Sequence, residues 1–328
     1  MLENNTICIL QSASVRPQVT IAIPTFKRSA LLRDALDSAL CQLWFENYEV
    51  LVCDNNPERG DETEILMSTY DNTRLSYYKN HENLGIVGNW NQLYHLAKGE
   101  WIVMLHDDDM LAPFFLHYIF NSDDRIYEKG DLIFPSFTSS ESRFSYANAD
   151  KDRKITYPKL IDFVGFNLIG PPLGMTIKKD AKIEIGDFVL RNYPSPDYDY
   201  YVRTLLKGYK IVKLLGEPMA YYRISVNESL KAEIQIGFIK NKFEIGNYIV
   251  NKFPAIIRLF LGAYNDLTSY LMAKSRQKEY PEDNILTDIV NKTEIVGARL
   301  FFARLTRKFM AYRVRQCFPD FLSQYETD

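Results

Sequence analysis

The chain has 328 residues, 46% of them hydrophobic, which is enough for one large domain or one domain with an appendage. A net charge of −3 at pH 7 gives no general electrostatic attraction to nucleic acid. The four cysteines form no CxxC pair, so we expect reduced thiols rather than a disulfide framework or a zinc site. The N-terminus does not resemble a secretory signal, and no stretch approaches the ~20 apolar residues that cross a bilayer. These features predict a cytoplasmic protein.

Strands and helices alternate over the first 110 residues. Short apolar runs rich in β-forming residues predict strands, and apolar residues at helical spacing predict helices. The predicted strands are 19–26, 48–56, 74–80 and 101–109, and the predicted helices are 29–40, 62–70 and 83–98. Such alternation predicts a parallel sheet with right-handed crossovers and helices on both faces.

The pattern loosens after residue 113. Further strands are expected at 132–137 and 174–179, and a short helix at 198–207. From about residue 226 the pattern is helical and repeatedly basic. We therefore predict an α/β domain over residues 1–228 and a helical, basic C-terminal extension over residues 229–328.

Polar residues stand at the carboxyl ends of all four predicted strands. They are Thr25 with Lys27 and Arg28, Asp54 with Asn55 and Asn56, Asn80 to Asn83, and Asp107 to Asp109. Because ligands of parallel sheets bind beyond these ends, the four groups are expected to meet at one rim.

The segment VMLHDDDMLAP places three consecutive aspartates after an apolar strand. Carboxylates suit a hard cation such as Mg²⁺ or Mn²⁺, and Mg²⁺ usually takes one or two of them. The alternative is a solvated acidic turn that caps the following helix. The other rim residues favour the metal site. We expect His106, directly before the aspartates, to shape the rim or form a hydrogen bond with it.

Four segments together resemble the family 2 glycosyltransferases with the GT-A fold. The resemblance covers roughly residues 19–229 and rests on the segments VTIAIPTFKR, YEVLVCDNN, ENLGIVGNWNQLYHLAKGEWIVMLHDDDMLAP and PDYDYYVRTLLKGYKI. It implies a GT-A α/β fold, a nucleotide-diphosphate sugar donor and Mn²⁺ or Mg²⁺ at the aspartates. It also implies transfer of one sugar to a glycan or polyprenyl-linked acceptor, as in bacterial O-antigen or capsule assembly.

The resemblance also implies roles for individual residues. The donor-binding residues would be Pro24, Thr25, Phe26, Arg28, Asp54, Asn83, Gly85, Asn89 and Asp107. Within this set, Asp54 would meet the base and Asp107 the ribose. Asp108 would contact the metal, and Asp109 is counted in the same metal site.

The catalytic base is expected just before the helix that carries Arg203. Inverting relatives usually have Glu-Asp there, whereas this chain has Pro196-Asp197. The resemblance favours Asp197 as general base, with Asp199 as the fallback. The alternative is that Asp197 only caps the helix.

Other departures leave other functions open. Trp90 stands where many relatives have an arginine near the diphosphate, so Lys27, Arg28 or Lys79 would have to supply the charge. A sugar nucleotidyltransferase and a catalytically degenerate sugar-nucleotide-binding assembly subunit are the alternatives. The first would need a glycine-rich basic motif at the first strand, which PTFK is not.

The segment 298–315 has six basic residues and no acidic one. On a helical wheel Phe301, Leu305, Phe309 and Tyr312 share one side. This arrangement fits a helix lying on an anionic membrane at the inner face of the cell. It fits equally a helix that packs its apolar stripe on the catalytic domain.

Overall fold

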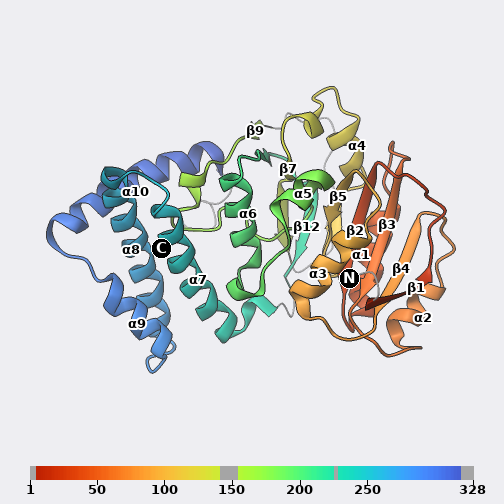
Figure 1. Cartoon of the computed structure of the whole chain (residues 1–328), viewed down its shortest axis with the longest axis horizontal. Helices are drawn as coiled ribbons and strands as arrows, with labels where there is room; N and C mark the ends of the chain where they lie inside the picture. Colours follow the sequence, from red (N-terminus) through yellow and green to blue (C-terminus); the bar gives the residue numbers. More distant parts are fainter. Residues whose placement is uncertain (1–4, 141–153, 225–227, 319–328) are drawn as a thin grey trace. The chain divides into compact units, whose positions relative to one another are not determined.

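The computed structural model describes residues 5–140, 154–224 and 228–318. These residues form two compact units (Figure 1). The sheet unit comprises the described residues within 1–155, 171–188 and 209–225, and the helical unit comprises those within 156–170, 189–208 and 226–328. The division at residue 228 stays a prediction. The compact units differ from that division, because residues 156–170 and 189–208 group with the C-terminal helices.

A nine-stranded sheet forms the centre of the sheet unit. Its order is β1-β4-β3-β2-β5-β10-β7-β11-β9, and β6, β12 and β8 form a second small sheet. The strands are β1 (Thr6–Leu10), β2 (Val19–Thr25), β3 (Tyr48–Asp54), β4 (Leu75–Asn80), β5 (Trp101–Met104), β6 (Met110–Leu111), β7 (Leu132–Phe134), β8 (Phe137–Ser140), β9 (Lys154–Thr156), β10 (Thr176–Lys178), β11 (Ile211–Leu215) and β12 (Ala220–Arg223).

The middle of the large sheet is parallel, as predicted. Strand β2 lies between β3 and β5 and runs parallel to both, and β4 continues the parallel set beyond β3. Strands β1 and β10 are antiparallel to their neighbours. The mainly parallel α/β fold with C-terminal helices is therefore confirmed. Strand β10 lies within the strand expected at 174–179, whereas β1 was not predicted, because a run of five residues gives too little periodicity.

Helices cover the sheet and build the helical unit. The α-helices are α1 (Ser29–Leu40), α2 (Glu62–Ser68), α3 (Gly85–Leu96), α4 (Phe115–Phe120), α5 (Lys179–Ile185), α6 (Pro196–Leu206), α7 (Ala232–Val250), α8 (Ala255–Gln277), α9 (Asn284–Thr293) and α10 (Gly297–Cys317). Short 3₁₀ turns lie at 126–128, 160–163, 190–192 and 228–230.

One hydrophobic core holds the parallel strands to α1. Val19, Ile21 and Ile23 alternate along β2 and pack with Leu32 and Leu36 of α1, all fully buried. The apolar residues repeat every two positions along the strand and about every 3.6 positions along the helix, as the sequence indicates. The core fixes where β2 and β5 end, and so where the polar residues that follow them lie.

The helical unit is stabilised by contacts among α7, α8, α9 and α10. Helix α10 packs on α8: the rings of Phe260 and Phe302 meet edge to face at 4.9 Å, and Arg299 pairs with Asp266. Of the helices in the described ranges, none combines the length and apolar character needed to span a membrane.

Candidate active site

The three aspartates form a buried turn directly after β5. The backbone N–H of Asp109 donates to the carbonyl of His106 at 3.2 Å, which closes the turn. Asp107, Asp108 and Asp109 are only 6%, 8% and 0% exposed. Three adjacent carboxylates that are this well buried need positive charge nearby. The alternative of a solvated acidic turn is therefore wrong.

Arg28 and Thr25 supply part of that compensation from the end of β2. Arg28 Nη1 lies 3.0 Å from Asp108 Oδ2 and 3.5 Å from Asp107 Oδ1. The hydroxyl of Thr25 donates to Asp107 Oδ2 at 2.8 Å. Pro24 is buried in β2, and Phe26 is 41% exposed beside these groups in the chain. Two of the predicted donor-site residues, Thr25 and Arg28, therefore contact the aspartates, and the roles of Pro24 and Phe26 stay predictions.

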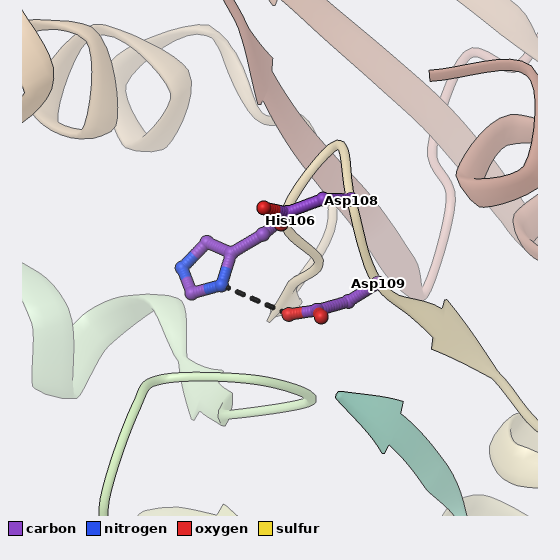
Figure 2. Close-up of side chains that lie close together, drawn as sticks. All are labelled: His106, Asp108 and Asp109. Atoms are coloured by element: carbon purple, nitrogen blue, oxygen red, sulfur yellow. Dashed lines mark hydrogen bonds and ion pairs between the residues drawn. The ribbon is translucent and has the colours of Figure 1, made fainter. Parts of the chain in front are cut away.

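His106, Asp108 and Asp109 bring possible metal-binding atoms close together (Figure 2). One such atom from each residue lies within 4.8 Å of the others. His106 Nδ1 lies 3.2 Å from Asp109 Oδ2, which confirms the expected hydrogen bond with the rim. The imidazole also stacks on Trp90, with ring centroids 5.6 Å apart and planes 22° apart.

Arg223 on β12 holds the same turn, and sequence reasoning missed it. Its backbone N–H donates to Asp109 Oδ1 at 3.0 Å, and its Nε donates to the carbonyl of Asp108 at 3.0 Å. Its Nη2 pairs with Asp34 at 2.6 Å. Both oxygens of Asp109 are therefore contacted, which fixes the direction of its carboxylate.

The pKa values of the cluster reflect its burial and its charge. Burial, together with the neighbouring charge of Asp108, raises the pKa of Asp107 to about 6. Burial also raises the pKa of Asp109. Burial alone would lower the pKa of His106, but the contact with Asp109 and the three carboxylate charges raise it overall. Protons and metal ions are thus expected to compete for this cluster.

We expect Mn²⁺ affinity to fall by up to about ten-fold between pH 7 and pH 5, because Asp107 gains a proton near pH 6. Because the pKa of Asp107 is raised, the ionised Asp107 carboxylate lowers the free energy of unfolding at pH values above the ordinary pKa of aspartate. A bound cation would offset this loss of stability. Isothermal titration at the two pH values measures the effect. Asp107→Asn should flatten the pH dependence, and an unchanged wild-type affinity at pH 5 would contradict the coupling.

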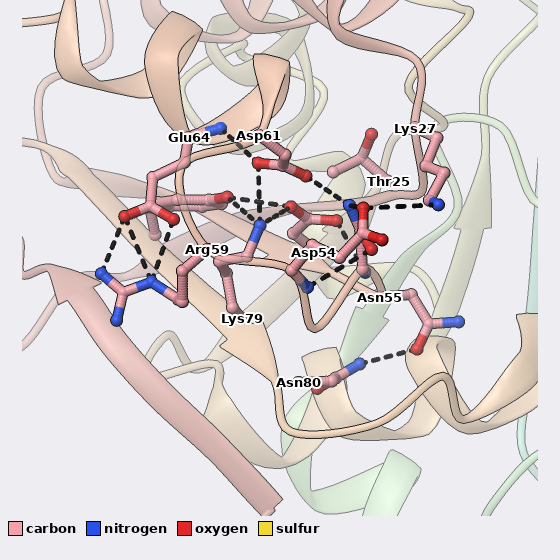
Figure 3. Close-up of polar contacts among 12 residues, drawn as sticks. Thr25, Lys27, Asp54, Asn55, Arg59, Asp61, Glu64, Lys79 and Asn80 are labelled. Atoms are coloured by element: carbon pink, nitrogen blue, oxygen red, sulfur yellow. Dashed lines mark hydrogen bonds and ion pairs between the residues drawn. The ribbon is translucent and has the colours of Figure 1, made fainter.

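Asp54 lies in a second polar network, at the end of β3 (Figure 3). Its carboxylate is fully buried and accepts from Lys79 Nζ at 2.7 Å and from the Tyr77 hydroxyl at 2.9 Å. Its other oxygen accepts from the backbone N–H of Asn56 at 2.9 Å. Lys79 also pairs with Asp61 at 2.9 Å. Base recognition by Asp54 stays a prediction, and the observed bonds assign the residue a structural task.

The expected role of Lys79 as a spare charge for the diphosphate does not fit this arrangement, because its ammonium group is fully buried between two carboxylates. Lys27 lies 3.5 Å from Glu58, with half of its side chain exposed. Among the three candidates, Arg28 is the one whose charge lies at the aspartates.

The predicted donor residues after β4 form a network of amide side chains. Asn83 accepts from Asn55 Nδ2 at 2.7 Å and from the N–H of Gly85 at 2.9 Å. Asn89 is buried; it donates to the carbonyl of Cys53 at 3.1 Å and accepts from Asn80 at 2.9 Å. Gly85 has a φ of +69°, which favours glycine at this turn into α3. The network fixes the start of α3 against β3 and β4.

Lys79→Met should lower the free energy of unfolding by about 3–5 kcal/mol, because it leaves the buried carboxylate of Asp54 and the half-buried carboxylate of Asp61 without their cation. Chemical unfolding followed by circular dichroism measures this loss. Lys27→Met is the matched control: its ion pair is exposed, so the loss should be below about 1 kcal/mol. Equal effects at the two positions would argue against a central role for the buried pair.

Asp197 and Asp199 lie in the helical unit, in the first turn of α6. Asp199 is bonded on both oxygens, to Asn192 at 2.7 Å and to Arg203 at 2.7 Å. Asp197 accepts from Asn167 Nδ2 at 3.0 Å. The helix cap is Ser195, with no side-chain cap hydrogen bond, so Asp197 is not acting as the N-cap.

Asn167 is the second residue that sequence reasoning missed. Its side-chain amide donates to the carbonyl of Gly170 at 3.2 Å and accepts from the N–H of Gly170 at 3.3 Å. These bonds fix the amide that donates to Asp197. No local sequence signal marks Asn167, because its partner lies 30 positions later in the chain.

Solved structures with a similar fold include complexes with nucleotide sugars. The chain matches TarS of S. aureus, residues 1–349 in complex with UDP-GlcNAc, with a TM-score of 0.62 and 14% identity, covering 84% of this chain and 79% of that one. It also matches a mannosyltransferase of Pyrobaculum calidifontis in complex with GDP-Man and Mn²⁺, with a TM-score of 0.52 and 13% identity, covering 95% and 90%. The fold is therefore GT-A.

Residues 20–167 match the family model described as glycosyl transferase family 2. A glycosyltransferase of Methanocaldococcus jannaschii is 22% identical over 72% of this chain and 81% of its own length. A β-1,3-glucosyltransferase of Campylobacter jejuni, named for its GalNAc(5)-diNAcBac-PP-undecaprenol acceptor, is 27% identical over 43% of this chain and 46% of its own. The chain is a transferase that carries a family 2 glycosyltransferase domain.

Proposed function

We propose that this enzyme moves one sugar from a nucleotide-diphosphate sugar to a hydroxyl of a glycan or lipid-linked acceptor, with inversion and with a divalent metal ion. The supporting observation is the buried aspartate turn with Arg28 and Thr25 at the ends of two neighbouring parallel strands. Related enzymes are described with UDP-GlcNAc, with GDP-Man and Mn²⁺, and with an undecaprenol-linked acceptor.

The residues divide the chemistry between them. Asp108 would hold the metal, which neutralises the departing diphosphate when bound. Arg28 adds a positive charge beside Asp107 and Asp108 and would stabilise the negative charge that develops on the departing diphosphate. Asp197, held by Asn167, would accept the proton of the acceptor hydroxyl. The sugar carbon would pass through an oxocarbenium-like state as the bond to the diphosphate breaks and the bond to the acceptor oxygen forms.

A thermal-shift screen of nucleotide-diphosphate sugars, with and without Mn²⁺, tests the donor site. At least one sugar nucleotide should raise the unfolding temperature, and Mn²⁺ should enlarge the shift, because ligand that binds only the folded state stabilises it. The corresponding free sugars serve as controls. If no sugar nucleotide stabilises the protein in a metal-dependent way, the proposed function is wrong.

The helix α10 supports a place for the acceptor at a membrane surface. Phe301, Leu305, Phe309 and Tyr312 are 50–64% exposed, and we call them the α10 stripe. The opposite side of the helix, with Ala303 and Met310, is buried. Within the helical unit the α10 stripe is therefore exposed.

Charge favours an anionic membrane over a second copy of the chain as the partner of the α10 stripe. Arg299 and Arg313 pair with aspartates within the helical unit, whereas Arg304, Arg307 and Lys308 are exposed. Two copies meeting through this helix would bring these charges together. Each basic residue near an anionic membrane surface contributes about 1 kcal/mol to binding. We propose peripheral contact through residues 298–315.

Replacing Phe301 and Phe309 by Gln should abolish flotation with vesicles that contain anionic phospholipid, because it removes the largest exposed rings of the stripe. The helix should stay folded, since its buried side is untouched; deleting it would instead expose α8. Ile183→Gln, which replaces an apolar residue that is 67% exposed on α5, is the matched control. Equal flotation of both variants and wild type would remove the membrane role.

A further inference from the structure

We infer that His106 is a direct metal ligand, and that its imidazole makes the site prefer Mn²⁺ over Mg²⁺. This inference rests on the proposed function, since it concerns the metal that would assist transfer from the donor. It differs from the expectation that His106 only shapes the rim. It assigns a specificity-determining role to a residue that stands before the aspartates rather than among them.

The first argument is the geometry of the donor atoms. Two ligand atoms at ~2.1 Å from one octahedral ion lie about 3 Å apart when they occupy neighbouring positions. His106 Nδ1 and Asp109 Oδ2 are 3.2 Å apart, which matches that spacing. The donor atoms of His106, Asp108 and Asp109 all lie within 4.8 Å of one another, so one ion can reach all three after small side-chain movements (Figure 2).

The second argument is that the imidazole is held in place. Its ring stacks on Trp90, and Trp90 in turn meets Phe188 edge to face at 5.3 Å. Both aromatic residues are buried. The ring therefore keeps Nδ1 directed at Asp109, and a ligand that is already positioned loses little entropy when an ion binds.

The third argument concerns the hydrogen bonding of the second ring nitrogen of His106, Nε2. Among the described residues, the buried Nε2 of His106 has no hydrogen-bond partner. Without metal, Nδ1 carries the proton that it donates to Asp109; in the tautomer with the proton on Nε2, Nδ1 would instead present its lone pair to a bound ion. A histidine that served only to hold the rim would gain more from bonding on both nitrogens.

The chemistry of the donor set then decides the metal. Mg²⁺ favours a shell of oxygen atoms, whereas imidazole nitrogen suits transition metals, and affinity for such ligands rises along the first-row series from Mn²⁺. A site with two carboxylates and one imidazole accepts Mn²⁺ with all three groups. Mg²⁺ would gain little from the imidazole.

Pulsed electron paramagnetic resonance of the protein with Mn²⁺ tests the ligand directly. The imidazole nitrogen should produce ¹⁴N modulation in the electron spin-echo envelope of wild type, and His106→Asn should lose it. Asparagine can still donate a hydrogen bond to Asp109, so it keeps a positioning role and removes the imidazole ligand. His95→Asn, at a histidine 3.5 Å from Asp187, is the matched control and should keep the modulation.

Titrations with Mn²⁺ and with Mg²⁺ give the second readout. His106→Asn should weaken Mn²⁺ binding by on the order of ten-fold and leave Mg²⁺ binding nearly unchanged. Absent ¹⁴N modulation, with Mn²⁺ still bound through Asp108, would overturn the inference and leave the proposed function standing. Absence of any Mn²⁺ binding that depends on Asp108 would instead overturn both.

Discussion

Asp108→Asn should abolish Mn²⁺-dependent stabilisation by the sugar nucleotide and reduce transfer by roughly 10³-fold. Metal assistance to a departing diphosphate contributes several kcal/mol to the transition state, and about 1.4 kcal/mol corresponds to a factor of ten. The amide keeps the size of the side chain and removes its charge. Thermal shift and initial rates, each with and without Mn²⁺, measure the two effects.

The metal-free Asp108→Asn protein should unfold at the wild-type temperature or above it, because the change removes one of three crowded buried charges. That result would show that the variant loses metal binding without losing its fold. Asp123→Asn makes the same chemical change at an exposed position of the sheet unit and should behave as wild type. Unaltered Mn²⁺-dependent donor binding by the Asp108 variant would show that the ion is held elsewhere.

The parallel part of the fold could be predicted because its signals are local. The apolar positions of β2 and α1 repeat with the periods of a strand and a helix, and the observed helix, Ser29–Leu40, coincides with the predicted one. The polar ends of β2 and β5 follow from the same alternation. Thr25, Arg28 and the aspartates could therefore be expected at one rim before any contact among them was known.

The contacts that complete the site could not be predicted, because they join distant parts of the chain. Arg223 bonds to Asp109 from 114 positions later, and nothing in the local sequence of β12 indicates that partner. Lys79 shares a face of β4 with Leu75 and Tyr77, but its pairing with Asp54 on the neighbouring strand depends on tertiary packing. The sequence also could not show which side of α10 is buried, because both sides of that helix carry apolar residues.

Asp197→Asn should lower kcat by ~10²–10⁴-fold and leave donor affinity and folding unchanged, because a positioned general base contributes about that factor. The amide still accepts the hydrogen bond from Asn167, so the local structure should persist. Single-turnover transfer measures the chemical step, and isothermal titration with the donor measures binding. Asn167→Ala should show a smaller loss, since Asp197 would then remain present with less restraint.

Asp199→Asn is the discriminating control for this assignment. Both oxygens of Asp199 are already bonded, to Asn192 and Arg203, so its neutralisation should lower the stability of α6 more than it lowers kcat in the folded fraction. Transfer by Asp197→Asn within ten-fold of wild type, together with loss of transfer in a folded Asp199→Asn protein, would assign the base to Asp199.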